Sequence, residues 1–215
     1  ENGFKQKKDA EDLVKKLSAN GMEATLVASE KKKEKKAPPM LYNLAELQND
    51  CSSLFKISPS DTLKIVQELY EKKLVTYPRT DARVLSTAVA KEIYKNISGL
   101  KRYTPMAAYA DEVLNMGSYK TIAKTKYVND KQITDHYAII PTGQGMGALR
   151  GLSEIAANVY EIICRRFLSI FYPAAEYQKL AMTLAKQDEF LFANIKYMLK
   201  EGYLKVATNR FARKK

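Results

Sequence analysis

The sequence predicts an α+β protein with more than one domain, in which a β-rich domain is interrupted by an inserted, mainly helical domain. Alternating apolar residues near both ends of the 215-residue chain are typical of strands, whereas capped helical patterns fill the middle. Strands at opposite ends must find partners to satisfy their backbone groups. We therefore expect residues 1–38 and 172–215 to form the β-rich domain and residues 39–171 to form the helical insertion.

The N-terminal segment predicts a helix and then a strand. Asp9 can cap a helix that ends near residue 19, and Gly21 suits the left-handed position that follows it. The alternation of residues 22–28 suits a strand. Residues 30–36 contain only lysine and glutamate, and two prolines follow, so this segment is expected to be a hinge or an exposed loop.

Capping signals delimit the helices of the middle segment. The first of them is expected to end near Lys73 and the third at Gly117. The last and longest extends to about Ile170, and its apolar side should carry much of the core. Each predicted helix begins at a residue that can accept a hydrogen bond from the first turn, namely Ser58, Ser86, Thr104 and Ser153.

In the C-terminal segment, apolar residues again alternate with a period of two residues. Residues 180–184 and 190–192 alternate on either side of a polar turn at residues 186–189. Leu204 and Val206 repeat the spacing once more. This part of the chain is therefore expected to supply two or three strands.

The charge balance favours a polyanionic partner. The 36 basic residues exceed the 24 acidic ones, for a net charge of +12, which makes nucleic acid the first candidate. The alternative is that the excess lysine only keeps the chain soluble.

The composition excludes several classes of protein. Two cysteines and one histidine cannot supply the four ligands of a structural zinc site, and no apolar run is long enough for a membrane span. We expect a soluble, cytoplasmic protein, favour a monomer, and expect no contact with a membrane. Because the chain begins at Glu1 and ends in a basic stretch, we also expect it to be a piece of a longer protein.

The segment Leu74–Asp81, with the sequence LVTYPRTD, carries the residues best suited to chemistry. Pro78 favours an extended Tyr77, so Tyr77, Arg79 and Asp81 would point to one side of the chain if the extension persists. A tyrosine oxygen can be a covalent nucleophile, and a neighbouring arginine can hold a phosphodiester oxygen. The alternative is a loop with a packed tyrosine and a surface Arg–Asp pair.

Residues 69–71 followed by residues 74–81 closely resemble the active-site signature of the type IA DNA topoisomerases. A second segment, Asp135–Thr142 (DHYAIIPT), resembles the DHHAIIPT segment of that family. Its Ile-Ile-Pro-Thr sequence is similar to that of the topoisomerase III branch. Tyr137 replaces the frequent second histidine, and Ala82 replaces a frequent serine. The two differences concern the positioning of DNA and not the nucleophile.

The resemblance implies specific roles. Tyr77 would attack single-stranded DNA to form a 5′-phosphotyrosine link, and Arg79 would assist at the scissile phosphate. The only histidine, His136, would lie near the DNA phosphates, where an imidazole can stabilise an anion. The other motif residues expected to bind DNA or position its phosphates are Thr80, Asp81 and Thr142.

The resemblance also implies the remaining parts of the enzyme. The β-rich domain would be the arch, or gate, and the inserted helical domain would carry the catalytic tyrosine. The intact isomerase would use Mg²⁺ bound by a Toprim domain that has no counterpart here, so we expect no metal site in this chain and no activity of the chain alone.

Two other functions remain open. One is a non-catalytic module that binds single-stranded nucleic acid with its basic groups and some of its 14 tyrosines. The other is a different tyrosine strand transferase, which the single histidine disfavours. Residues 143–148 match a dinucleotide-binding fingerprint, but no βαβ unit surrounds them, so we expect a flexible loop.

Overall fold

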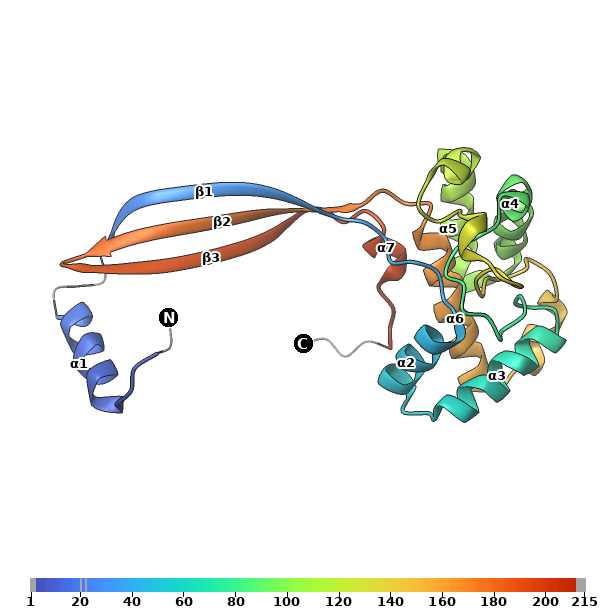
Figure 1. Cartoon of the computed structure of the whole chain (residues 1–215), viewed down its shortest axis with the longest axis horizontal. Coiled ribbons are helices and arrows are strands. Elements are labelled where there is room, and N and C mark those ends of the chain that lie inside the picture. The colour runs from blue at the N-terminus through green and yellow to red at the C-terminus, as the bar shows by residue number, and fades with distance from the viewer. Residues whose placement is uncertain (1–2, 20, 22, 212–215) are drawn as a thin grey trace. The chain divides into compact units, whose positions relative to one another are not determined.

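The computed structural model describes residues 3–19, 21 and 23–211 (Figure 1). The chain divides into two compact units, one made of residues 1–35 and 176–200 and the other of residues 36–175 and 201–215. Glu1, Met22 and residues 212–215, on which parts of the predictions fall, lie outside the described residues. The helices and strands are α1 (Lys7–Ser18), β1 (Thr25–Lys36), α2 (Leu44–Phe55), α3 (Pro59–Glu71), α4 (Thr87–Gly99), α5 (Thr104–Met116), α6 (Glu154–Ser169), β2 (Ala175–Lys186), β3 (Glu189–Lys200) and α7 (Leu204–Ala207).

The first unit is a three-stranded sheet with the order β1-β2-β3, accompanied by α1 (Figure 1). β2 and β3 form an antiparallel hairpin that pairs Lys186 with Glu189 at the turn, where the polar turn was predicted. Gln187 supplies the positive φ of 55° that such a tight turn requires. Lys16 of α1 forms an ion pair of 2.9 Å with Glu189 and thereby joins the helix to the hairpin.

The Lys-rich run at residues 30–36 is part of β1, so the prediction of a hinge or loop was wrong. Its side chains are exposed on nearly every position, and no apolar alternation is needed where neither face is buried. Cross-strand ion pairs stabilise it instead. Glu34 lies 2.6 Å from Lys179 and 3.1 Å from Lys196, and Lys35 pairs with Glu176.

The second unit contains helices α2 to α7, and its caps follow the sequence closely. Ser58, Ser86 and Ser153 each accept a hydrogen bond from the first turn of their helix, as predicted. α5 ends at Met116 with Gly117 as its C-cap, as predicted, but its N-cap is Tyr103 and not Thr104, and that cap makes no side-chain hydrogen bond. α2 was not delimited from the sequence, although Asn43 caps it through a bond from the Glu46 amide of 2.9 Å.

α6 forms the centre of the helical unit, as its long apolar side predicted. Tyr160, Phe167 and eight further residues of α6 are buried. The helix packs against α2, α3, α5 and α7. No helix in the described part of the chain has the length and apolar character needed to cross a membrane.

The C-terminal segment differs from the predicted third strand. Leu204 and Val206 lie in the four-residue helix α7, because one repeat of apolar spacing does not distinguish a strand from a helical turn. The Tyr203 amide donates to the Pro173 carbonyl (2.9 Å), and Arg165 of α6 donates to the Val206 carbonyl (2.9 Å). Residues 201–211 therefore lie with the helical unit. The assignment of the two units to an arch domain and a cleavage domain stays a prediction.

Candidate active site

The two motif segments lie side by side in the helical unit. α3 ends in a turn in which Lys73 has a φ of 61° and the Leu74 amide donates to the Leu69 carbonyl (2.9 Å). The chain then runs antiparallel to the second motif, with a bridge between Val75 and Pro141. The sequence analysis identified both motifs, but it did not predict that their backbones pair with each other.

Threonine hydroxyls hold the paired segments together. The Thr76 hydroxyl donates to the Ala138 carbonyl and accepts from the Ile140 amide, both at 3.0 Å. The Thr80 hydroxyl donates to the His136 carbonyl at 2.8 Å. At the other end, the Thr142 hydroxyl donates to the Lys73 carbonyl at 2.5 Å. Thr80 and Thr142 thus make backbone contacts, and Thr76 is a site residue that the sequence analysis did not single out.

Tyr77 and His136 come together at the surface of this pair. Their ring centroids lie 4.4 Å apart with an interplanar angle of 46°. Tyr70 of α3 also contacts the Tyr77 ring edge-on, with the ring centroids 5.4 Å apart. Tyr77 is half-buried and His136 is exposed. The Tyr77 ring therefore contacts two other rings, while its side chain stays partly open to solvent.

An open hollow of about 580 Å³ lies in front of Tyr77. Its charged groups are few: the Lys73 ammonium forms no ion pair with any described residue, whereas the Glu71 carboxylate accepts a hydrogen bond from Gln67. A half-open, partly basic hollow of this size can take a nucleotide-sized anion. The lining residues are Tyr70, Glu71, Lys73, Val75, Thr76, Tyr77, His136, Tyr137, Thr142 and Gln144.

Arg79 and Asp81 do not line this hollow. The Thr80 amide donates to the Pro78 carbonyl (3.0 Å), which makes a tight turn at Arg79, so the extension beyond Pro78 does not persist. Both side chains are exposed, and the Arg79 guanidinium makes no hydrogen bond or ion pair within the described part of the chain. The structure therefore joins Tyr77 with His136 and leaves Arg79 projecting into solvent.

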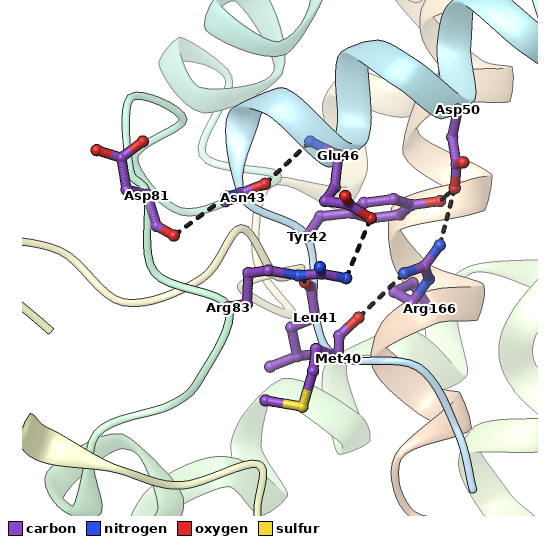
Figure 2. A network of polar contacts seen from close by, with 9 residues as sticks. All are labelled: Met40, Leu41, Tyr42, Asn43, Glu46, Asp50, Asp81, Arg83 and Arg166. Carbon is purple, nitrogen blue, oxygen red and sulfur yellow. Dashed lines mark hydrogen bonds and ion pairs between the residues drawn. The ribbon is translucent and has the colours of Figure 1, made fainter. Parts of the chain in front are cut away.

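A polar network fixes the loop that follows Tyr77 to α2 (Figure 2). The Asn43 side chain donates to the Asp81 carbonyl (3.1 Å). Beside it, the Leu44 amide donates to the Thr80 carbonyl (3.1 Å). Arg83 donates to the Leu41 carbonyl (3.2 Å) and pairs with Glu46 of α2 (3.1 Å). The loop that carries Arg79 is anchored on both sides of that residue.

A second part of the network anchors the segment before α2 to α6 (Figure 2). The Arg166 guanidinium pairs with Asp50 (2.8 Å), donates to the Met40 carbonyl (3.0 Å) and lies 4.1 Å from the centre of the Tyr42 ring. The Tyr42 hydroxyl donates to Asp50, and burial raises the pKa of this phenol, which therefore stays protonated. The Tyr42 carbonyl accepts from the Ile139 amide (2.8 Å), which links this network to the second motif.

The other candidate nucleophiles and ligands are unsuitable. Cys51 and Cys164 are free and buried, and burial raises the pKa of the Cys51 thiol to about 12, so the thiol stays protonated. Among the described residues, no group of three or more His, Cys, Asp or Glu side chains is placed to hold a metal ion. Residues 143–145 form a turn with positive φ at Gly143 and Gly145, and residues 146–148 begin a 3₁₀ segment, Met146–Gly151.

Comparison with known proteins identifies the class. A sequence model of a family described as DNA topoisomerase matches residues 1–215, and the chain belongs to that family. Among its relatives, DNA topoisomerase 3 of Bacillus cereus is 35% identical over 209 residues, which are 95% of this chain and 27% of that protein. DNA topoisomerase 3 of Bacillus subtilis is 35% identical over 198 residues, 90% of this chain and 26% of that protein. The chain thus spans about a quarter of the length of these relatives.

A solved structure supports the fold. Full-length topoisomerase I from Thermotoga maritima matches with a TM-score of 0.66 and 22% identity, over 100% of this chain and 34% of that one. The chain therefore belongs to the type IA topoisomerase family, as the two motifs predicted, and the relatives given above are bacterial topoisomerases 3. Its mixed helical and antiparallel sheet fold agrees with that assignment.

Proposed function

We propose that this chain supplies the catalytic tyrosine of a type IA DNA topoisomerase, and that Tyr77 cleaves and rejoins single-stranded DNA. The observation that carries the proposal is the contact between Tyr77 and His136. Two residues from different motifs meet at 4.4 Å beside an open hollow, although neither packing nor hydrogen bonding requires an exposed histidine there.

The proposed reaction is a transesterification. The Tyr77 oxygen attacks a backbone phosphorus, the bond from that phosphorus to the 3′ oxygen of the preceding nucleotide breaks, and the phenolic proton ends on that 3′ oxygen. A phosphotyrosine link to the 5′ side of the strand results. The reverse reaction restores the strand, and no nucleotide is consumed because the phosphodiester is exchanged for another phosphodiester.

The phenol needs electrostatic help, because a tyrosine with its ordinary pKa near 10 is ionised in only about one molecule in a thousand at neutral pH. We propose that His136 donates to the phosphate from beside Tyr77 and that the unpaired Arg79 guanidinium turns onto the same phosphate when DNA binds. Thr80, Thr142 and Asp81 act as positioning residues: the Thr80 and Thr142 hydroxyls donate to the His136 and Lys73 carbonyls, and the Asp81 carbonyl accepts from Asn43.

The described residues do not fit a magnesium site, so no step of the proposal runs through Mg²⁺ bound to this chain. We propose that Mg²⁺ is held by residues outside this chain and that the chain alone does not relax DNA. We also propose that the whole protein is a cytoplasmic monomer that acts on single-stranded DNA.

The test is adduct formation by the whole protein that contains this chain. Single-stranded DNA labelled at one end is incubated with the protein and Mg²⁺, the mixture is denatured, and the labelled peptide is mapped. Wild-type protein should retain label on the 5′-linked side of the break at Tyr77, and Tyr77→Phe should form no adduct while single-strand binding changes by less than about twofold.

Tyr70→Phe is the matched control, because Tyr70 lines the same hollow and contacts the Tyr77 ring. It should keep the adduct. An adduct that survives Tyr77→Phe, or one linked to the 3′ side, would overturn the assignment. Binding of single strands without any adduct in the wild type would favour the non-catalytic binding module.

A further inference from the structure

A second hollow, of about 540 Å³, lies on the face of α4 next to the candidate active site. It is lined by Ala88, Val89, Lys91, Glu92, Asn96 and Tyr137. Tyr137 also lines the hollow in front of Tyr77, so one half-buried ring belongs to both hollows. The proposed chemistry at Tyr77 gives this second hollow no role.

The two hollows are fixed relative to each other. The Asn96 side chain of α4 donates to the Pro141 carbonyl (2.9 Å), and Arg102 donates to the Gly143 carbonyl (3.0 Å). Gly143 has a φ of 77°, and a Cβ at this position would lie 2.9 Å from the Asn96 and Lys95 carbonyls. The second motif and the glycine after it therefore pack directly on the α4 backbone, and Tyr137 belongs to the motif that is fixed there.

The charges around the second hollow favour a phosphate. The exposed Lys91 ammonium makes no ion pair with any described residue. The Glu92 carboxylate, which is the acidic group of this hollow, is paired with Lys95 at 3.0 Å. A flat aromatic ring beside an unpaired ammonium is the combination with which proteins hold single-stranded nucleic acid.

We propose that the strand segment that stays linked to Tyr77 through its 5′ phosphate runs across Tyr137 into the hollow on α4. A base stacks on the Tyr137 ring, and a phosphate of the same segment lies at Lys91. This inference rests on the proposed function. Because Tyr77 and Tyr137 belong to one rigidly paired set of segments, the strand end stays aligned for rejoining while the covalent link exists.

The position of the strand can be tested by crosslinking to the chain itself. The probe is a 5′-phosphorylated oligothymidylate of about ten nucleotides, within the usual size for such sites, with 5-iododeoxyuridine as its second nucleotide. We expect a crosslink to Tyr137 or to the peptide that contains residues 88–96. The same base at the 3′ end of the probe serves as the control for position and should crosslink less to Tyr137.

Variants test the stacking separately from the fold. Tyr137→Leu should weaken binding of this probe about fivefold or more, whereas Tyr137→Phe should bind like the wild type, since stacking is worth about 1–3 kcal/mol per base. Tyr94→Leu is the matched control, because Tyr94 is an exposed tyrosine of α4 that lines neither hollow. It should bind like the wild type. Circular dichroism checks that each variant is folded.

Lys91→Gln tests the phosphate contact by the salt dependence of binding. The slope of log affinity against log salt concentration should fall by about 0.7, the value for one phosphate on a single strand. Lys64→Gln, which removes an exposed lysine of α3 away from both hollows, should leave the slope unchanged. A role of Lys91 in stability alone would not change the slope.

The outcomes separate the two proposals. Crosslinks near Tyr77 and His136 without any at Tyr137 or α4, together with unchanged binding by Tyr137→Leu, would overturn the path across Tyr137 and leave the proposed function standing. Absence of crosslinks at both hollows, with no adduct at Tyr77 in the whole protein, would overturn both.

Discussion

Replacing Thr76 with valine should destabilise the helical unit, although the two side chains have nearly the same shape. Thr76 is the only described residue whose side chain both donates to the second motif and accepts from it. Valine keeps the volume and the β-branch but removes both hydrogen bonds. The variant therefore measures the polar join between the two motif segments.

The magnitude follows from what the substitution leaves behind. Ala138 and Ile140 are both 0% exposed, so the carbonyl of one and the amide of the other would have no partner and little access to water. A buried group left without its hydrogen bond costs about 1–3 kcal/mol. With partial relaxation of the two segments, we expect Thr76→Val to lower the free energy of unfolding by about 2–4 kcal/mol.

The assay is urea unfolding of the chain followed by far-UV circular dichroism, which reports mainly on the helical unit. With a slope of about 2 kcal/mol/M, the middle of the usual range for urea, the midpoint should fall by about 1–2 M. Thr121→Val is the matched control, because Thr121 is exposed and its hydroxyl bonds only the Ser118 carbonyl three residues earlier. It should change the free energy by less than about 0.5 kcal/mol. Equal effects of the two substitutions would refute the reasoning.

Two further predictions concern the support of the site and its pH dependence. Arg166→Met should lower the free energy of unfolding by about 1–3 kcal/mol, because Asp50 and the Met40 carbonyl lose a shared partner while the aliphatic volume is kept; an unchanged urea midpoint would contradict this. Lys205 and Tyr172 hold the pKa of the Glu112 carboxyl below its usual 4.5, so its stabilising effect is complete above that pH and is lost as the pH falls through the lowered pKa. Glu112→Gln should therefore lower the unfolding midpoint at pH 7 but not at pH 2, and a difference that persists at pH 2 would be incompatible with this cause.

The helix boundaries were predictable because their causes are local. Ser58, Ser86 and Ser153 each lie immediately before an apolar helical pattern, and the structure finds each hydroxyl bonded to the first turn. α2 has the same kind of cap, but its apolar stripe is short, with only Leu47 and Cys51 buried. A sequence pattern with two buried positions does not delimit a helix.

The errors come from contacts between distant parts of the chain. The lysines of residues 30–36 form a strand because Glu34 and Lys35 meet partners on β2 and β3, and no composition rule contains those partners. Leu204 and Val206 form a helical turn because Arg165 holds the carbonyl of Val206. In each case the decisive partner is supplied by another strand or helix, so it could not be predicted from neighbouring residues.

The candidate site shows the same division between local chemistry and distant support. The motif around Tyr77 indicated which side chains could react, and the comparisons agree with the family to which the motif pointed. The motif did not show that Arg79 lies outside the hollow, because this depends on a turn stabilised by Asn43 and Leu44 of another segment. Nor did it show that Tyr137 reaches a second hollow on α4.

The motif residues fall into two physical groups with different requirements. The hydroxyls of Thr76, Thr80 and Thr142 donate hydrogen bonds to backbone carbonyls of the facing segment. The two paired segments are therefore rigid before any substrate binds. In the described part of the chain, the Arg79 guanidinium and the His136 imidazole make no hydrogen bond, so neither must break a contact to reach a phosphate. A rigid support with unpaired reactive groups lowers the reorganisation that binding and transesterification require. The threonines therefore have a mechanical role in the signature: they keep two segments that are distant in sequence in register, so that a tyrosine from one and a histidine from the other come into contact.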